Sequence, residues 1–389
     1  MPDASDNGRL RVLTLVDHLG TSGGGERLAM EMVRRLDRDR FDRFYCISRW
    51  DEGACEDEHE LRAVARLRDE GVHVMGLGRQ STAEVWRWRP LVRVLREEDV
   101  HVLHSHKFGS NVWAAAIAPA ARVPVFLAHE HSWSYEGRPV RRMLDRHLIA
   151  RSCDRLLAVS EADRRRMIAV EHIPPESIVV VPNGIDPLPP ADGARIRTEL
   201  GLSPEDPVVG AVALLRREKG LELLVRAIAA LVGDIPRLRV VVAGDGPERA
   251  PLEALAAELG VAEHLRILGI RSDVPDVLAA IDVAVNCSVF EGTPLAILEY
   301  MDAALPIVAT RVGGVPDILE DGRDGVLVES GDVSGFASSI ANLLNDRERA
   351  RSLGERARVR RREHYDLTAT VRRIEGLYQD LVAAAGSRR

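Results

Sequence analysis

Two glutamates, Glu291 and Glu299, bracket a loop that is predicted to lead into a helix. Thr293 and Pro294 resemble an N-cap followed by a first-turn residue, so we expect the helix to begin there. The loop N–H groups can bind ligand hydroxyls, and the two carboxylates suit a polyol such as a sugar or a ribose. A surface pair of glutamates is the alternative. The pair Gly313-Gly314, after the next predicted strand, favours the ligand site.

Lysine is rare in this chain, because only Lys107 and Lys219 occur among 53 basic residues. Each of the two positions could therefore need a compact ammonium rather than a planar guanidinium. For each position taken alone, a chance occurrence of lysine explains the observation equally well. Lys219 follows a predicted strand at the point where a helix begins, and a cation there opposes the helix dipole. A diphosphate leaving group would explain it, since its charge grows as its bond to a sugar breaks. A solvated charge run is the alternative.

A glycine-rich loop, residues 20–26, follows the first predicted strand and opens directly into a helix. Its three consecutive glycines permit close backbone approach, and the helix N-terminus attracts anions. The loop matches neither the P-loop nor the dinucleotide-binding fingerprint. We expect it to contact a phosphate rather than to be a merely flexible turn.

Histidines gather where two neighbouring strands are expected to end. They are His101, His104, His106, His129 and His131. Alternate positions on a strand point the same way, so a metal site has to be considered. Because no carboxylate beyond Glu130 stands out as a partner, we favour a polar cleft lining and expect no metal. Purely structural histidines remain possible.

Short apolar runs alternate with stretches of helical period along the whole chain, which predicts parallel sheets covered by helices on both faces. Strands are expected at residues 10–16, 44–48, 72–77, 100–104, 125–129, 156–160 and 178–181. A second set is expected at residues 208–213, 238–243, 265–268, 283–286, 307–309 and 326–328. The rhythm lapses in the proline-rich residues 183–207, which we interpret as the crossing between two doubly wound α/β domains that face across a cleft. Ligands of such sheets lie beyond the carboxyl ends of the strands.

The composition is that of a globular enzyme. The 389 residues are 46% hydrophobic and carry a net charge of −7, which disfavours a nucleic-acid binder. No apolar run is long enough to span a bilayer, and the first residues do not resemble a signal peptide. The four cysteines form no C-x-x-C pair, so neither a disulfide framework nor a zinc ribbon is expected. A cytoplasmic location is the expectation.

Taken together, these motifs resemble the retaining glycosyltransferases of family 4, which have the GT-B fold of two Rossmann-like domains. The resemblance runs over nearly the whole chain through residues 23–26, 159–160, 181–186, 219–220, 244–247, 291–299 and 309–316. It implies an N-terminal acceptor-side domain of residues 1–185 and a C-terminal nucleotide-sugar domain of residues 186–365. Residues 366–389 would form a crossing helix that packs back on the first domain.

The resemblance also implies roles for individual residues in binding the donor's phosphates and base. Gly24 and Gly25 would approach the diphosphate through their N–H groups. Lys219 and a nearby arginine would clamp it in place of a metal ion. The stretch 269–274, which includes Val274, would line the nucleobase pocket.

A second set of implied roles concerns the two sugars of the donor. Glu299 would hold the ribose hydroxyls, and His131 would contact the transferred sugar near its reacting carbon. Glu291 would hold the transferred sugar together with backbone N–H groups. Those N–H groups lie in the donor-binding stretch that consists of Gly292, Thr293, Pro294 and Leu295.

One position departs from the family pattern. Many members carry arginine five residues before the lysine, where this chain has Leu214; Arg216 is the expected substitute.

The implied reaction is transfer of a hexosyl unit from a UDP- or GDP-linked sugar to an acceptor hydroxyl, with no cofactor. Alternatives are a sugar-nucleotide hydrolase or 2-epimerase on the same fold, and a non-catalytic nucleotide-sugar-binding subunit.

The acceptor would be a sugar, a lipid-linked molecule or a small molecule. The stretch 86–89 and the arginines Arg138, Arg141 and Arg142 put aromatic and basic residues on the first domain. Such surfaces can dock on anionic lipids at the inner face of a membrane. Ordinary solvated arginines are favoured over that contact.

Overall fold

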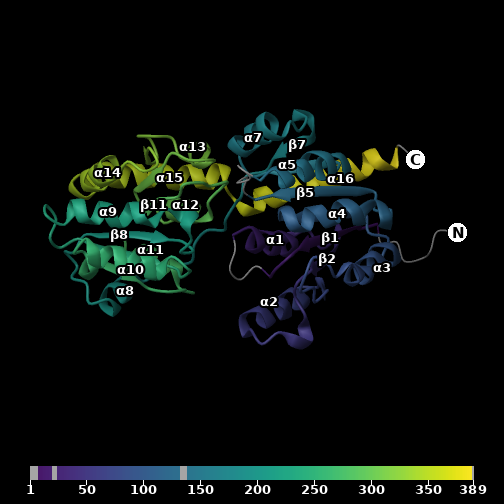
Figure 1. Ribbon diagram of the computed structural model, residues 1–389, viewed down its shortest axis with the longest axis horizontal. Coiled ribbons are helices and arrows are strands. Elements are labelled where there is room, and N and C mark those ends of the chain that lie inside the picture. Colours follow the sequence, from purple (N-terminus) through teal and green to yellow (C-terminus); the bar gives the residue numbers. More distant parts are fainter. Residues whose placement is uncertain (1–7, 20–23, 132–137, 388–389) are drawn as a thin grey trace. The chain divides into compact units, whose positions relative to one another are not determined.

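The computed structural model describes residues 8–19, 24–131 and 138–387 of the chain (Figure 1). The chain forms two compact units. Unit 1 comprises Met1–Asn183 and Leu367–Arg389, and unit 2 comprises Gly184–Asp366. The first crossing lies two residues before the expected boundary and the second one residue after it. The proline-rich segment is not a free linker, because Ile185 and Ile196 lie in the core of unit 2.

Unit 1 contains a seven-stranded, fully parallel sheet in the order β3-β2-β1-β4-β5-β6-β7. Its strands are β1 (Leu10–Val16), β2 (Phe41–Ile47), β3 (His73–Gly76), β4 (Val102–His106), β5 (Val125–Glu130), β6 (Arg155–Ala158) and β7 (Ile178–Val180). Its helices are α1 (Gly24–Arg35), α2 (Glu58–Asp69), α3 (Arg89–Glu97), α4 (Lys107–Ala121), α5 (Pro139–Leu144), α6 (Ala150–Ser152), α7 (Glu161–Glu171) and α16 (Leu367–Gly386). The strand order reverses between β1 and β4, so ligands are expected at the carboxyl ends of these two strands.

The last helix, α16, is an integral part of unit 1 although it follows all of unit 2 in sequence. It lies beside α1 and β5, and is yellow in Figure 1. Its apolar side chains recur at helical spacing and join the core of unit 1. These side chains are Leu367, Val371, Ile374, Tyr378 and Leu381.

Unit 2 contains a six-stranded parallel sheet in the order β10-β9-β8-β11-β12-β13. Its strands are β8 (Val208–Val212), β9 (Arg239–Ala243), β10 (Leu265–Ile267), β11 (Val283–Asn286), β12 (Ile307–Thr310) and β13 (Val326–Val328). Its helices are α8 (Gly193–Glu199), α9 (Leu221–Leu231), α10 (Arg249–Glu258), α11 (Val274–Ala279), α12 (Leu295–Asp302), α13 (Val315–Ile318), α14 (Val333–Asn345) and α15 (Arg347–His364). Here the order reverses between β8 and β11.

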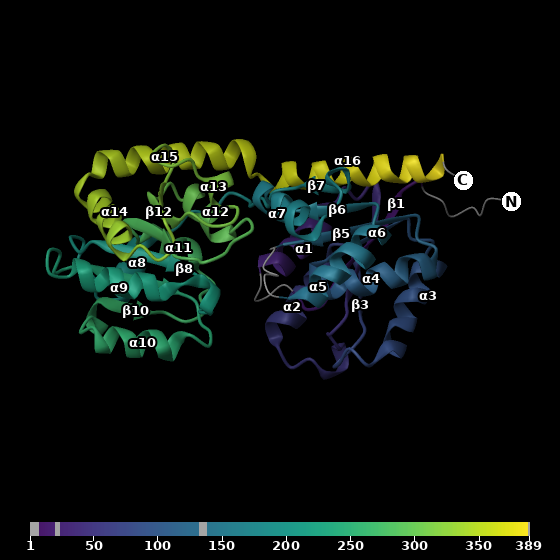
Figure 2. The ribbon, with the colours of Figure 1, turned by 45° about the horizontal axis from the view of Figure 1, so that its top comes forward.

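Both faces of this second sheet are covered, as a run of apolar residues on each strand requires. Val240 and Val242 of β9 point into one core, which holds α9, α10 and α14. The alternate residues Val241 and Ala243 point into the other, which holds α8, α11 and α12. Figure 2 shows α9 and α14 side by side over the first face.

The expected strands are all present, with one shift that matters for function. The strand expected at residues 100–104 is β4, Val102–His106. His106 therefore lies inside a buried strand rather than in the loop beyond it, and His104 lies in the middle of that strand rather than at its end. Among the described residues, no helix combines the length and the apolar character that crossing a membrane requires.

Candidate functional site

In unit 2, the loops after β8 and β11 are joined at the point where the strand order reverses. The N–H of Val289 donates to the carbonyl of Glu218 at 2.9 Å. Gly220 has a φ of +57°, and a Cβ there would lie 2.3 Å from the carbonyl oxygen of Cys287. Any larger residue would force the two loops apart, so this glycine fixes where the preceding residue, Lys219, stands.

Lys219 and Glu291 meet across this junction. The Lys219 ammonium donates to Oε1 of Glu291 at 2.6 Å, and the hydroxyl of Ser288 donates to the same oxygen at 2.6 Å. Glu291 is 7% exposed, whereas about a quarter of the Lys219 side chain remains accessible. The ammonium is thus held at the carboxyl end of the sheet and is still open to an anionic ligand.

The loop after β12 closes over the backbone of Glu291. The N–H of Gly314 donates to the carbonyl of Glu291 at 3.0 Å. Gly313 has a φ of +50°, and a Cβ there would lie 1.8 Å from that carbonyl oxygen. The glycine pair is thus needed for close packing of the two loops, and it fixes Glu291 from behind.

The helix start in this stretch differs from the expectation. Pro294 is the N-cap residue with a ψ of 117°, and α12 begins at Leu295, so Thr293 is not the N-cap and Pro294 not the first helical residue. Gly292, Thr293 and Pro294 are buried in the loop between Glu291 and the helix. Glu299 is buried on α12, one turn beyond its start.

Arg216 contacts this pair through its backbone, because its carbonyl accepts from the N–H of Lys219 at 2.9 Å. Its side chain is exposed and lines a pocket of about 400 Å³ together with Arg217, Arg226 and Glu248. Within the described part of the chain, no hydrogen bond or ion pair joins the Arg216 guanidinium to Lys219 or Glu291. Leu214, at the position where the family carries arginine, is half-buried.

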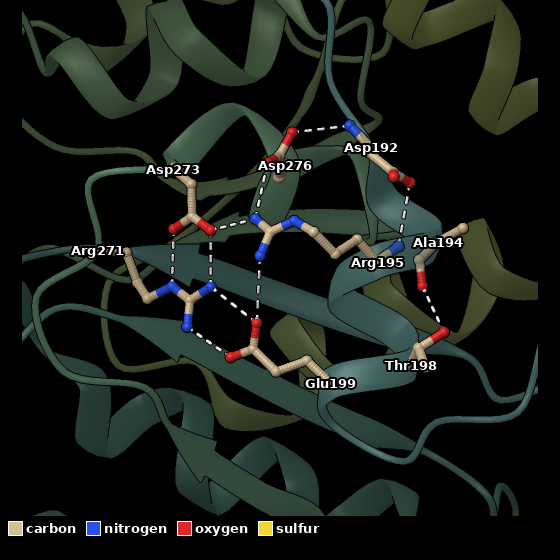
Figure 3. Close-up of polar contacts among 8 residues, drawn as sticks. All are labelled: Asp192, Ala194, Arg195, Thr198, Glu199, Arg271, Asp273 and Asp276. Carbon is tan, nitrogen blue, oxygen red and sulfur yellow. Dashed lines mark hydrogen bonds and ion pairs between the residues drawn. The ribbon is translucent and has the colours of Figure 1, made fainter.

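The stretch 269–274, expected to line a base pocket, is tied to α8 by an ion cluster (Figure 3). Arg271 donates to Glu199 at 2.6 Å and to Asp273 at 2.7 Å. Arg195 is bonded to Asp273 and, at 2.7 Å, to Asp276. The hydrogen bonds from Arg271, followed by those from Arg195, hold the pKa of Asp273 well below its usual range. Val274 follows directly and packs against the unit 2 core.

In unit 1, Gly25, Lys107 and His131 meet beyond the ends of β1, β4 and β5. Gly24 and Gly25 are the first residues of α1. A Cβ on Gly25 would lie 2.8 Å from Cγ of His131 and 2.9 Å from Cε of Lys107. Lys107 has a φ of +68° and forms an ion pair with Glu26. Both lysines of the chain are therefore paired with a glutamate at the reversal point of a sheet.

Three histidines of β4 and β5 (His104, His106 and His129) form a stack with His131, which directly follows β5. Nδ1 of His106 and Nε2 of His131 share a hydrogen bond of 2.9 Å, and Nδ1 of His104 is bonded to the Tyr378 hydroxyl at 2.6 Å. Burial lowers the pKa of His129 to about 3 and those of the other three well below their usual value. The stack is therefore neutral at physiological pH.

This stack does not have the shape of a metal site. The ring nitrogens of His104, His106 and His129 lie within 4.8 Å of one another. A tetrahedral zinc ion with bonds of about 2.1 Å needs lone pairs that converge on one point. The rings of His104 and His129 are instead stacked at 5.3 Å with an angle of 4° between their planes. Their lone pairs therefore cannot both point at an ion lying between the rings.

Several contacts at these sites were not expected from the sequence. The rarity of lysine pointed to Lys107, and the glycine-rich motif included Glu26, but nothing in the sequence marked the two as partners. Nothing in the sequence marked Ser288 or Tyr378, which hold Glu291 and His104. Residues 20–23 of the glycine loop and residues 132–137, which follow His131, lie outside the described residues.

Sequence models of two families match this chain in consecutive parts. The model described as Glycosyltransferase Family 4 matches residues 22–187, and the one described as Glycosyl transferases group 1 matches residues 192–360. The N-acetyl-alpha-D-glucosaminyl L-malate synthase of Bacillus anthracis is 31% identical over 49% of this chain and 50% of its own length. The D-inositol 3-phosphate glycosyltransferase of Nocardia farcinica is 33% identical over 66% of this chain and 61% of its own. The chain thus matches about half to three-fifths of the length of these two relatives.

Solved structures share the fold over almost the whole chain. Anabaena Alr3699/HepE, solved in complex with UDP-glucose, is similar with a TM-score of 0.83 and 22% identity over 96% of this chain and 100% of its own. Sucrose-phosphate synthase from Thermosynechococcus elongatus gives a TM-score of 0.80 and 20% identity over 97% and 100%. Two parallel α/β units that match such structures from end to end, with both family models matched in order, establish that the chain belongs to glycosyltransferase family 4 and has the GT-B fold.

Proposed function

We propose that this chain is a retaining glycosyltransferase that moves a hexosyl unit from a UDP- or GDP-linked sugar to an acceptor hydroxyl without a metal ion. The observation that carries the proposal is the Lys219–Glu291 pair at the reversal point of the unit 2 sheet. A fixed, accessible ammonium there suits a diphosphate, and a carboxylate and loop amides beside it suit a sugar. A nucleotide sugar as ligand is supported by Alr3699/HepE, which is similar in fold and was solved in complex with UDP-glucose.

In the proposed reaction, protein groups position the donor and stabilise charge. Lys219 neutralises the leaving diphosphate, while Glu291, the amides of residues 292, 293 and 295 and His131 hold the transferred sugar. Glu299 binds the ribose, and Gly24 and Gly25 approach the phosphates. Retention of configuration is assigned to attack on the same face as departure, with a donor phosphate oxygen accepting the acceptor's proton.

The acceptor and the cellular location are also part of the proposal. The acceptor is a sugar, a lipid-linked molecule or a small molecule; two relatives are named for L-malate and D-inositol 3-phosphate. A cytoplasmic location with peripheral membrane contact is also proposed, supported by the exposed Trp86. The arginines at 138, 141 and 142 lend less support to membrane contact, because Arg141 stacks on Phe108 and Arg142 donates to the carbonyl of Val170.

The test is a thermal-shift screen of nucleotide sugars, followed by product analysis with the stabilising donor. A donor that binds the folded state raises the melting temperature by mass action. We expect transfer to an acceptor hydroxyl, retained anomeric configuration by NMR and full activity in a chelator. Loss of activity in chelator, or inverted product, would contradict the proposal.

A second candidate is a nucleotide-sugar-binding subunit without activity. It is favoured by Leu214, which stands where the resemblance implies an arginine. Donor binding without turnover over a broad acceptor panel would support it. Release of the free sugar or an epimer from donor alone would instead indicate a hydrolase or epimerase.

A further inference from the structure

Unit 1 has an apolar groove between α3 and α4, away from the ends of the strands. We call it the tryptophan groove and define it by Trp86, Trp88, Val92, Trp113 and Ile117. Its volume is about 730 Å³, within the range of sites for drug-sized ligands. Its lining on α4 runs from Trp113 to Ala120, about 9 to 20 Å along the helix from Lys107, and includes none of the residues of the cluster at the N-terminus. The groove is thus separate from the proposed sugar site.

The open side of the groove is unusually apolar for a surface. Trp86 is 60% exposed and Val85, which also lines the groove, is 56% exposed. The floor, in contrast, is rigid. Trp88 and Trp113 pack at 5.2 Å, and the Arg79 guanidinium stacks on both rings at 4.3 and 5.0 Å. A fixed apolar floor with an exposed aromatic rim is typical of surfaces that receive an apolar partner.

One polar group in the floor has no partner. Trp88 is 3% exposed and lines the groove, and its indole N–H has no acceptor in the described part of the chain. The nitrogen is itself inaccessible to solvent, so Trp88 lines the groove with apolar atoms of its ring. The groove therefore suits a molecule that is mostly apolar.

One rim of the groove is basic. Arg89, Arg93 and Arg96 recur on one face of α3, and the acidic residue among the lining side chains is Glu97. Glu97 is 3.9 Å from Arg93, and Arg96 donates to the Ala120 carbonyl across the groove at 2.6 Å. On a chain of net charge −7, this rim is a local excess of cations. It suits an acidic head group.

We propose that the tryptophan groove takes an acyl chain of an anionic phospholipid, with the head-group phosphate at Arg89 and Arg93. The proposal rests on the membrane contact proposed above and not on sugar transfer. Exposed Trp86 would enter the interfacial region, where its amphipathic ring is favoured, while Trp88 and Trp113 contact the chain. Docking would then be selective for anionic lipid and would place an acyl chain beside the indole rings.

Binding is tested by co-sedimenting the full chain with two kinds of vesicle, phosphatidylcholine alone and an equal mixture with phosphatidylglycerol. We expect binding to the anionic vesicles alone. Arg89→Glu with Arg93→Glu should weaken it by roughly thirty-fold or more, since each juxtamembrane cation contributes about 1 kcal/mol. The matched control is Arg347→Glu with Arg351→Glu, exposed arginines of the same spacing on α15, which should bind as the unchanged protein does.

Insertion is tested separately with acyl chains brominated near the head group, which quench nearby indoles. We expect quenching by anionic vesicles, and its loss in Val85→Asp but not in Val359→Asp, an α15 valine exposed to a similar extent (52%). Thermal unfolding checks that each variant is folded. If Val85→Asp left both binding and quenching intact, charge alone would explain the attraction to anionic vesicles, and the proposed role of the groove would be overturned. Binding to neither vesicle, or equal binding to both, would overturn it as well.

Discussion

Both lysines of this arginine-rich chain lie at the reversal point of a sheet and are paired with a glutamate. An arginine could supply the charge at either place, but its fork is longer and planar, whereas the compact ammonium of Lys219 shares a single oxygen of Glu291 with the hydroxyl of Ser288. The pairing also explains how a buried carboxylate is tolerated before any ligand binds, because the ammonium compensates its charge.

Lys219→Ala is expected to lower turnover by roughly two decades or more, since a well-placed donor to a developing negative charge contributes about 3–4 kcal/mol. Steady-state kinetics with a saturating donor would measure it. Arg217→Ala is the control, because Arg217 is exposed beside the same turn. Unchanged turnover in a folded Lys219→Ala protein would remove the lysine from the reaction.

His106 is expected to be a positioning residue for His131. Its hydrogen bond occupies Nε2 of His131 and fixes the ring, while the opposite nitrogen, Nδ1, is buried and has no partner in the described part of the chain. His106→Phe keeps the stacking and removes this bond, and should lower kcat roughly five- to ten-fold with little change in the donor KM. His73→Phe, remote from the stack, is the control. A change in stability with unaltered kcat would assign His106 a structural role only.

At the scale of the elements, the sheets and most helices could be predicted because buried parallel strands appear as short Val- and Leu-rich runs. The shift of β4 shows where that signal fails. Its apolar run ends at Leu103, yet His104 and His106 continue the strand as buried, neutral rings. A pattern based on residue type treats histidine as polar. Only the neighbouring strand β5 and α16, far apart in sequence, supply the burial and the Tyr378 bond that neutralise it.

The candidate site was foreseeable to a similar extent. Glycine pairs and an isolated lysine are informative because few other residue types can replace them. Lys219 and Glu291 lie in loops that follow strands, and Gly25 lies in the first turn of the helix that follows β1. The partners of these residues were not foreseeable. Ser288 and Glu26 are common residue types, and their roles depend on which loops meet in space.

The histidine stack should make unit 1 sensitive to acid. The folded chain keeps His129 neutral to about pH 3, whereas the unfolded chain takes up a proton near pH 6.5. Below pH 6.5 the unfolded state binds more protons, so stability decreases as the pH falls, by about 1.4 kcal/mol per unit for this residue alone. Urea unfolding at pH 7 and pH 5 should show His129→Phe losing less stability than the unchanged chain. His59→Phe, on the surface, should not differ from it.

The ion cluster between α8 and the loop 269–274 should act on donor binding rather than on stability. Exposed ion pairs contribute little to folding, but this one fixes a loop proposed to line the base pocket. Arg195→Ala should raise the donor KM several-fold at nearly constant kcat and melting temperature. Arg226→Ala, which breaks an exposed pair with Glu222 at 2.6 Å, is the matched control. Equal donor KM values in the two variants would show that the ion cluster does not affect donor binding.

At the scale of the whole molecule, unit 1 is discontinuous: its sheet is built from the first part of the chain, but its core is completed by the last helix. The side chains that α16 contributes are almost fully buried. The hydroxyl of Tyr378 bonds His104 at 2.6 Å, and the carboxylate of Glu375 accepts from the N–H of Asp37 at 2.7 Å. Unit 1 can therefore reach its final structure only after unit 2 has been synthesised.

Ending the chain at Asp366 should unfold or loosen unit 1 and leave unit 2 intact. Burial of five apolar side chains contributes about 7–15 kcal/mol in total, which is comparable to the whole stability of a domain. Calorimetry should show one transition lost, and the remaining one, from Gly184–Asp366, should still shift upward with the nucleoside diphosphate of the donor. As a control, a chain ending after Gly386 keeps all of α16 and should show both transitions. If the chain ending at Asp366 also kept both, α16 would be an accessory to unit 1 and not part of its core.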